Sequence, residues 1–445
     1  IVNNQLIWDT TLDPLDYPRE IREEFFKKSF FYRKKFVSWL GIISKDYINN
    51  FDWWIKLPSS RDPFKSNLYK NVIIFSILQN KKILKNVKII YFENKNFVEI
   101  IRNNKIFQLS YTKIRLKSKI YYLNSFINSI IFSFIVLIFV RFFKKKSKKK
   151  DLKDFILVNN YIDTKLNVKD HVFSGLKKNL KDKKNTFFVP NFLFNRNLIN
   201  LFKNIKNLSK ENYLFKENYI SLSEFIYSAF DTFFNYRQFK VKKFRKFIKV
   251  DFSLLIFSEL KSKKNFFTEF QSKLLLKFIE KLKINKFYPA KIIGRFENQN
   301  IDRAWFYGFK TFFPKTKSIG YQDFLYYPHL PNQSPTNYEF KANLIPDKIV
   351  MTSKSFIKNR REFCKNIKII LGPSLNKQKI FKSSKMSTNY KFVIALCGIK
   401  ALDEKMISWL YFLINKDDSL RIYLKPHPIL PIHKLRNFDI KIFKD

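Results

Sequence analysis

The chain has 445 residues and a formal net charge of +50, and 46% of its residues are hydrophobic. This length exceeds one ordinary hydrophobic core and predicts two or three domains, while the apolar content excludes a disordered polycation. Lysine greatly outnumbers arginine, which is typical of a genome-wide compositional bias that affects every position of a protein. No nucleic-acid-binding motif is present. The charge therefore favours acidic lipids and phosphorylated ligands as partners and disfavours nucleic acid.

The two cysteines, Cys364 and Cys397, and the four histidines do not show the spacing of metal ligands. We therefore expect no disulfide framework and no metal site.

Residues 1–118 are expected to form an N-terminal α/β region. Residues 87–92 have the length and apolar character of a strand, and a helical pattern follows as far as Arg102. The adjacent Trp53 and Trp54 suit stacking on sugar rings. Paired tryptophans more often pack in a core or at a membrane interface, and we favour that interpretation.

Residues 119–143 are expected to form a membrane-associated or transmembrane helix. Residues 120–140 carry no charge. At 1.5 Å per residue, about 21 helical residues cover roughly 31 Å, which is enough to cross a bilayer's hydrocarbon core. The basic juxtamembrane run at 144–153 favours an anionic, cytoplasmic surface, but the preceding flank is basic too. Three interpretations stay open: an embedded or re-entrant helix, a true span, and a long core helix of a soluble protein.

Residues 154–375 are expected to form a Rossmann-like, acceptor-side domain with a helical insertion. From residue 290 onward, strands alternate with helices, which predicts a parallel sheet that binds ligands beyond the carboxyl ends of its strands. Glu297 follows the strand at 291–296 and is placed to deprotonate a sugar hydroxyl as a general base. Asn298, Gln299 and Arg303 are the candidates for acceptor binding. The alternative is that Glu297 only caps the next helix or pairs with Arg303.

Two further segments carry candidate site residues. His329 lies in a long loop rich in tyrosine and proline, and a loop of that length in a compact domain is usually functional. A polar linker at 376–389 precedes residues 390–445, which have the pattern of an incomplete nucleotide-binding Rossmann-like domain. There, Lys425 and His427 follow a predicted strand and suit the phosphates of a nucleotide, with Gly398 also on the donor side. The alternative is that this segment merely ends a strand at the surface.

The fold class expected from these segments is α/β. Two Rossmann-like domains on either side of a linker describe a GT-B-like pair, here with an inserted membrane-associated helix and a truncated C-terminal domain. The strand pattern runs on to Asp445, so we expect the chain to be a fragment.

Several short motifs carry a resemblance to a known family. They are Trp53-Trp54 with Ser60-Arg61-Asp62 and Ser66; Glu297-Asn298-Gln299 with Asp302-Arg303-Ala304 and Gly308; Ser318-Ile319-Gly320-Tyr321-Gln322; Pro346-Asp347-Lys348-Ile349; and Lys425-Pro426-His427-Pro428. Together they resemble a bacterial family of surface carbohydrate biosynthesis proteins, which is similar in turn to GT-B polysialyltransferases, Kdo transferases and glycerophosphotransferases. The resemblance implies that His427 binds the phosphate of a CMP- or CDP-linked donor and that Glu297 is the base. The Ser/Thr-rich element that such enzymes carry further on is absent from this chain.

The function expected from the sequence is a metal-independent glycosyltransferase of capsule, O-antigen or lipopolysaccharide biosynthesis. It would transfer a sugar from a nucleotide donor, with no other cofactor, to a lipid-linked saccharide acceptor at the cytoplasmic face of the bacterial inner membrane. One alternative is a noncatalytic, membrane-associated scaffold of a polysaccharide assembly complex. Another is a polybasic protein that binds any polyanion in a strongly salt-dependent way.

Overall fold

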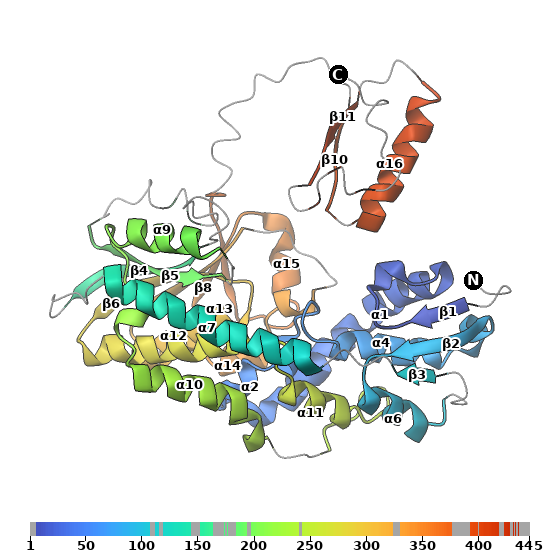
Figure 1. The fold of residues 1–445 in the computed structure, drawn as a ribbon, viewed down its shortest axis with the longest axis horizontal. Coiled ribbons are helices and arrows are strands. Elements are labelled where there is room, and N and C mark those ends of the chain that lie inside the picture. The colour runs from blue at the N-terminus through green and yellow to red at the C-terminus, as the bar shows by residue number, and fades with distance from the viewer. Residues whose placement is uncertain are drawn as a thin grey trace. The chain divides into compact units, whose positions relative to one another are not determined.

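The protein is described by a computed structural model (Figure 1). The described residues are 6–106, 112–114, 119–143, 152–162, 173, 176, 184–193, 197–239, 243–323, 330–375, 392–398, 400–417, 422–427, 430, 432 and 435. The chain divides into a large unit, Ile1–Thr11 with Arg19–Gln378, and a small unit, Leu12–Pro18 with Lys379–Asp445. The division after Gln378 falls inside the predicted linker. The N-terminal region, the long apolar helix and the Rossmann-like region, which the sequence separates, belong to one compact unit.

A six-stranded parallel sheet forms the centre of the large unit and confirms the predicted α/β class. Its order is β5-β4-β6-β7-β8-β9. The strands are β4 (Lys153–Ile162), β5 (Thr186–Phe192), β6 (Tyr288–Arg295), β7 (Lys317–Gln322), β8 (Lys348–Met351) and β9 (Lys368–Leu371). The chain runs outward from β4 to β5 and then returns to the other side of β4 at β6. Strand order therefore reverses between β4 and β6, which is where ligands bind in open α/β sheets.

Helices pack on both faces of this sheet because side chains alternate along each buried strand. In β4, Phe155 and Leu157 join one core cluster, whereas Ile156 and Val158 contact the other. The first cluster includes α10 (Leu222–Phe234), α12 (Phe266–Ile284) and α13 (Asn300–Phe312). The second includes α7 (Lys119–Phe143) and α9 (Leu198–Leu208). Shorter helices complete this part: α11 (Ser253–Lys261), α14 (Asn337–Lys341) and α15 (Ile357–Arg360).

A second parallel sheet lies in the N-terminal part of the same unit. Its order is β1-β2-β3, with β1 (Leu6–Asp9), β2 (Val87–Phe92) and β3 (Thr112–Ile114). The helices here are α1 (Arg19–Ser44), α2 (Phe51–Trp54), α3 (Leu57–Ser60), α4 (Leu68–Leu78), α5 (Lys81–Leu84) and α6 (Lys95–Asn103). Trp53 is fully buried, stacks on Tyr47 with 4.4 Å between ring centroids, and donates its Nε1–H to Ser44 Oγ at 3.0 Å. Trp54 is buried as well, so of the two roles favoured for the tryptophan pair, core or membrane interface, the structure shows the core role.

Helix α7 is apolar on all sides but buried on only one. Its segment Phe126–Phe143 is long and apolar enough to cross a membrane, with a mean hydropathy of 2.3, and 33% of it is buried in the protein. The buried face includes Phe132, Ser133 and Val136. Gln271 of α12 donates a 2.8 Å hydrogen bond to Ser133 Oγ, so one face of α7 is part of the folded unit. The opposite face exposes large apolar side chains at helical spacing, namely Ile127, Ile131, Phe134, Ile138 and Phe142.

The small unit contains one β-α-β element. Strands β10 (Phe392–Ala395) and β11 (Ile422–Lys425) pair in parallel, and α16 (Lys400–Ile414) connects them. Leu396, Ile407 and Leu435 form its own small core. The predicted α/β pattern of this segment is thus observed over the residues described.

Candidate active site

Five polar residues meet at the carboxyl edge of the large sheet, where strand order reverses. We call Tyr161, Arg295, Glu297, Gln299 and Asp302 the switch-point cluster. Tyr161 lies near the end of β4, Arg295 ends β6, Glu297 and Gln299 occupy the loop after β6, and Asp302 lies in the first turn of α13. The carboxyl ends of β4 and β6 and the first turn of α13 therefore lie together at this edge of the parallel sheet.

Glu297 keeps a partly exposed carboxylate in this cluster, with its side chain 23% exposed. Arg295 Nη2 donates to Glu297 Oε1, and Gln299 Nε2 donates to Glu297 Oε2 at 3.2 Å. Arg295, rather than Arg303, is therefore its ion-pair partner, and helix capping is performed by other groups. A carboxylate fixed at the edge of a sheet but open to solvent can accept a proton from a hydroxyl group.

Asp302 organises the loop beneath Glu297. Its Oδ2 accepts the backbone N–H of Glu297 at 2.8 Å and that of Gln299 at 3.1 Å, the second as part of a capping box at the start of α13. Its Oδ1 accepts the hydroxyl of Tyr161 at 2.7 Å. Burial raises the pKa of Asp302 to about 6, although the hydrogen bonds that its carboxylate accepts lower this pKa. Burial and the neighbouring Asp302 raise the pKa of Tyr161 well above its usual value.

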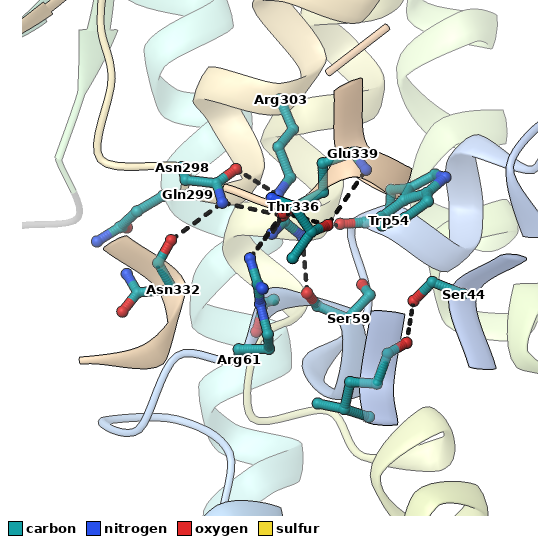
Figure 2. A network of polar contacts seen from close by, with 12 residues as sticks. Ser44, Trp54, Ser59, Arg61, Asn298, Gln299, Arg303, Asn332, Thr336 and Glu339 are labelled. Carbon is teal, nitrogen blue, oxygen red and sulfur yellow. Dashed lines mark hydrogen bonds and ion pairs between the residues drawn. The ribbon is translucent and has the colours of Figure 1, made fainter. Parts of the chain in front are cut away.

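Asn298 and Arg303, two of the predicted acceptor residues, lie inside the protein (Figure 2). Both side chains are fully buried. Arg303 donates from Nε to Asn298 Oδ1 at 3.0 Å and from Nη1 to the carbonyl oxygen of Trp54 at 2.7 Å. Asn298 adopts a left-handed backbone with φ of 61° and donates from Nδ2 to Glu339 Oε1 at 2.9 Å. Neither side chain faces solvent, so both side chains hold the loop that carries Glu297 in place.

One carboxylate, Glu339, joins this loop to the N-terminal region. Arg61 Nη2 donates to both oxygens of Glu339 at 2.8 Å, and Arg303 Nη2 donates to Oε1 (Figure 2). Burial opposes ionisation of Glu339, but the two guanidinium groups outweigh it and lower the pKa of Glu339. Burial lowers the pKa of Arg303 to about 10, still well above neutral pH. Glu339 and Arg303 are therefore charged at pH 7, and the buried ion cluster links the end of α3 to α13 and α14.

The predicted donor residues lie together in the small unit. Gly398 follows β10, and Lys425 and His427 lie at the end of β11, so all three are at the carboxyl edge of the same parallel pair. Gly398 has φ of +80°, and a Cβ atom added there would lie 2.4 Å from His427 Nδ1. The backbone of Gly398 thus approaches the imidazole as only glycine allows. Lys425 is exposed and His427 is partly buried.

A buried carboxylate fixes this glycine loop. Asp403, in the first turn of α16, accepts the backbone N–H of Cys397 at Oδ1 and that of Gly398 at Oδ2, each at 2.8 Å. The side chain of Asp403 is fully buried. Asp403 therefore holds the backbone of Cys397 and Gly398 beside His427.

His329 lies outside the described residues. Within the described part of the chain, no group of three or more His, Cys, Asp or Glu side chains has the arrangement of a metal site. Tyr161, Arg295 and Glu339 are site residues for which the sequence predicts no role. Tyr161 is detectable as a polar residue near the end of an apolar strand, but Glu339 has no local pattern that reveals its partners.

No protein-family model, no curated protein and no solved structure matches this chain.

Proposed function

We propose that the protein is a metal-independent glycosyltransferase of bacterial surface polysaccharide biosynthesis, with a GT-B-like pair of domains. The observation that carries the proposal is that both predicted chemical groups lie at carboxyl edges of parallel strands. Glu297 lies where strand order reverses in the large sheet, and His427 lies beside Gly398 at the end of β11. These are the positions at which α/β sheets bind ligands.

The donor in this proposal is a nucleotide sugar, with CMP- and CDP-linked sugars favoured by the resemblance of the Lys-Pro-His-Pro motif. Lys425 and His427 would contact the donor phosphate, and Gly398, which has no Cβ, lets the His427 imidazole lie against its backbone. The acceptor hydroxyl oxygen bonds to the anomeric carbon while the bond from that carbon to the phosphate oxygen breaks. The nucleotide leaves with the bonding electron pair, and Glu297 takes the hydroxyl proton.

The acceptor in this proposal binds at the exposed part of the switch-point cluster. Gln299 is half-buried and already donates to Glu297, so its amide is placed to hold a hydroxyl group near the base. His329 stays a candidate from its loop. Asn298 and Arg303 would act as positioning residues, because their side chains hold the loop and do not reach solvent.

The acceptor's lipid would be reached through helix α7, lying in the plane of the cytoplasmic leaflet. A true span would place lipid around the whole helix, whereas one face of α7 is packed against the sheet and α12. Helices α9 and α10 lie beside α7 (Figure 1). The other face of α7 is apolar, and these two helices add exposed apolar side chains. They are Leu198, Ile199 and Phe202 of α9 and Leu222, Ile226, Tyr227 and Phe230 of α10. The basic run at 144–153 follows directly in the sequence and suits anionic headgroups.

Nucleotide release tests the proposal. Membranes carrying the full-length protein are incubated with a panel of CMP-, CDP-, UDP- and GDP-sugars and pooled lipid acceptors, and the released nucleotide is measured. We expect release from one donor class and a loss of at least about a hundredfold in Glu297→Gln and in His427→Ala. Glu23→Gln, an exposed carboxylate on α1, is the matched control and should retain the rate. Absence of release from every donor would contradict the proposal and favour the noncatalytic scaffold.

A further inference from the structure

Tyr161 is a member of the switch-point cluster that the proposed reaction does not use. It lies near the end of β4, on the face of the sheet that α13 covers, and its ring packs against the core cluster that contains Phe155 and Leu157. Tyr161 is partly exposed, whereas Asp302, which accepts a hydrogen bond from its hydroxyl, is almost fully buried. Of these two hydrogen-bonded side chains, the tyrosine is therefore the one that a ligand can reach.

Asp302 holds Tyr161 close to the proposed base. One of its carboxylate oxygens, Oδ1, accepts the Tyr161 hydroxyl at 2.7 Å, and the other, Oδ2, accepts the backbone N–H of Glu297 at 2.8 Å. The tyrosine oxygen and the Glu297 backbone are thus fixed to the two oxygens of a single carboxylate. A sugar ring whose reacting hydroxyl lies at Glu297 therefore has Tyr161 within reach of its other hydroxyl groups.

The direction of the hydrogen bond between Tyr161 and Asp302 decides what the tyrosine offers to a ligand. Burial, the neighbouring Asp302 and the charge of Glu297 raise the pKa of Tyr161 well above its usual value, so the phenol keeps its proton at pH 7. Asp302, with a pKa of about 6, is mostly ionised at this pH and can only accept. The phenol proton therefore points towards Asp302, and no described residue donates to the tyrosine oxygen. Tyr161 thus presents a hydrogen-bond acceptor to a ligand.

Arg295 supplies hydrogen-bond donors to the same place. Its Nη2 donates to Glu297 Oε1, its side chain is 35% exposed, and its guanidinium group has N–H donors beyond that one. The site thus combines acceptors, at Glu297 and Tyr161, with donors at Arg295. A hydroxyl group both donates and accepts, so it matches this combination, whereas an ionised phosphate or carboxylate cannot donate to Tyr161.

We propose that Tyr161 binds a second hydroxyl group of the acceptor sugar, which donates its proton to Tyr161 Oη while the reacting hydroxyl lies at Glu297. The acceptor recognised at this edge of the sheet is then a sugar ring that presents two hydroxyl groups, one to the base and one to the tyrosine. This inference rests on the proposed function and names the part of the acceptor that the switch-point cluster recognises.

The saturation curve for the acceptor tests the inference, because Tyr161→Phe removes only the hydroxyl group. Nucleotide release by membranes carrying the full-length protein is measured against the concentration of pooled lipid acceptors, and separately against that of the nucleotide sugar. We expect Tyr161→Phe to raise the apparent KM for the acceptor about three- to tenfold, which corresponds to the loss of one hydrogen bond between uncharged groups. The kcat should stay within about twofold, and the KM for the nucleotide sugar should not change.

Tyr288→Phe is the matched control. Tyr288 is also exposed, but it lies at the start of β6, at the opposite edge of the same sheet, so its variant should keep the wild-type constants. An unchanged KM for the acceptor in Tyr161→Phe, or the same rise in both variants, would overturn the inference. A fall in kcat alone would also overturn it, because Tyr161 would then only support Asp302 beneath Glu297. No release by the wild type would instead contradict the proposed function, and this inference would fall with it.

Discussion

At the scale of single residues, Glu339 holds the most consequential position in the large unit. Two guanidinium groups contact its carboxylate, and all three side chains are nearly inaccessible to solvent. Removing one partner of a buried ion pair leaves an uncompensated charge in a medium of low dielectric constant. The loop that carries Glu297 therefore depends on a buried carboxylate that does not reach solvent.

Replacing Glu339 by Gln should lower the free energy of unfolding by about 3–5 kcal/mol, because Arg61 and Arg303 would stay buried without a counter-charge. Urea unfolding followed by circular dichroism measures this change. Glu362→Gln is the control: its partners Arg33 and Lys34 keep more contact with water, and its loss should stay near 1 kcal/mol. Equal losses in the two variants would contradict the importance assigned to the buried cluster.

Asp302 should make stability depend on pH. Its folded pKa of about 6 lies above the ordinary value of 3.8, so the folded state binds the proton more tightly. The resulting stabilisation is complete below about pH 4 and is lost as the pH rises through about 6. The free energy of unfolding of the wild type, relative to Asp302→Asn, should fall by on the order of 2–3 kcal/mol between pH 4 and pH 7.

The asparagine variant suits this comparison because it is isosteric and does not titrate. Its oxygen can still accept the two backbone N–H groups, and the Tyr161 hydroxyl can rotate to accept from its amide. Denaturant unfolding of both proteins across this pH range gives the difference directly. A difference that is constant with pH, or that grows as the pH rises, would show that Asp302 does not titrate in this way.

The positions of site residues could be predicted from the sequence only where they follow from local order along the chain. Glu297 and His427 each lie two residues beyond the end of a strand, and that position fixes which edge of the sheet they occupy. The burial of Arg303 depends on Glu339 and on the carbonyl oxygens of Trp54 and Ser59, which are distant in sequence. A polar residue in the first turn of a helix has the same local pattern whether it faces solvent or a buried carboxylate.

At the scale of elements, α7 shows how a helix that is apolar on every side can be only about one-third buried. Such a sequence is typical both of a core helix and of a membrane span, so the pattern alone leaves both open. The structure packs Phe132, Val136 and Val140 against the sheet and leaves Ile131 and Ile138 about half exposed. The strands of the large sheet were predictable because apolar runs of this length alternate with helical patterns.

Replacing Ile131 and Ile138 by Gln should weaken binding to vesicles of phosphatidylethanolamine and phosphatidylglycerol by roughly tenfold to a hundredfold. Each half-exposed isoleucine contributes about 1 kcal/mol when lipid covers it. Vesicle flotation measures the bound fraction. The control is Leu402→Gln with Phe412→Gln, which removes exposed apolar side chains from α16 and should not change binding. If both pairs bind equally well, α7 is not the lipid-facing element.

At the scale of the whole molecule, the domain boundaries predicted from the sequence differ from the boundaries of the compact units in the structure. The sequence separates residues 1–118 from residues 154–375 because an apolar helix and a basic run lie between them. In the structure both belong to one unit, joined by Arg61 with Glu339 and by Lys56 with Glu269, the latter at 2.7 Å and fully buried. Long-range ion pairs of this kind leave no periodic pattern in a sequence. The boundary near residue 378 was predictable because a polar linker marks it.

Transfer of a labelled sugar into the lipid fraction tests the central claim most directly. Membranes that carry the full-length protein are supplied with the radiolabelled nucleotide sugar that supports nucleotide release, and the label in the organic extract is counted. We predict label in the lipid fraction with the wild type and with Glu23→Gln, and at most about one hundredth of it with Glu297→Gln or His427→Ala. Equal labelling in the wild type and in both active-site variants, or no labelled lipid from any donor, would contradict it.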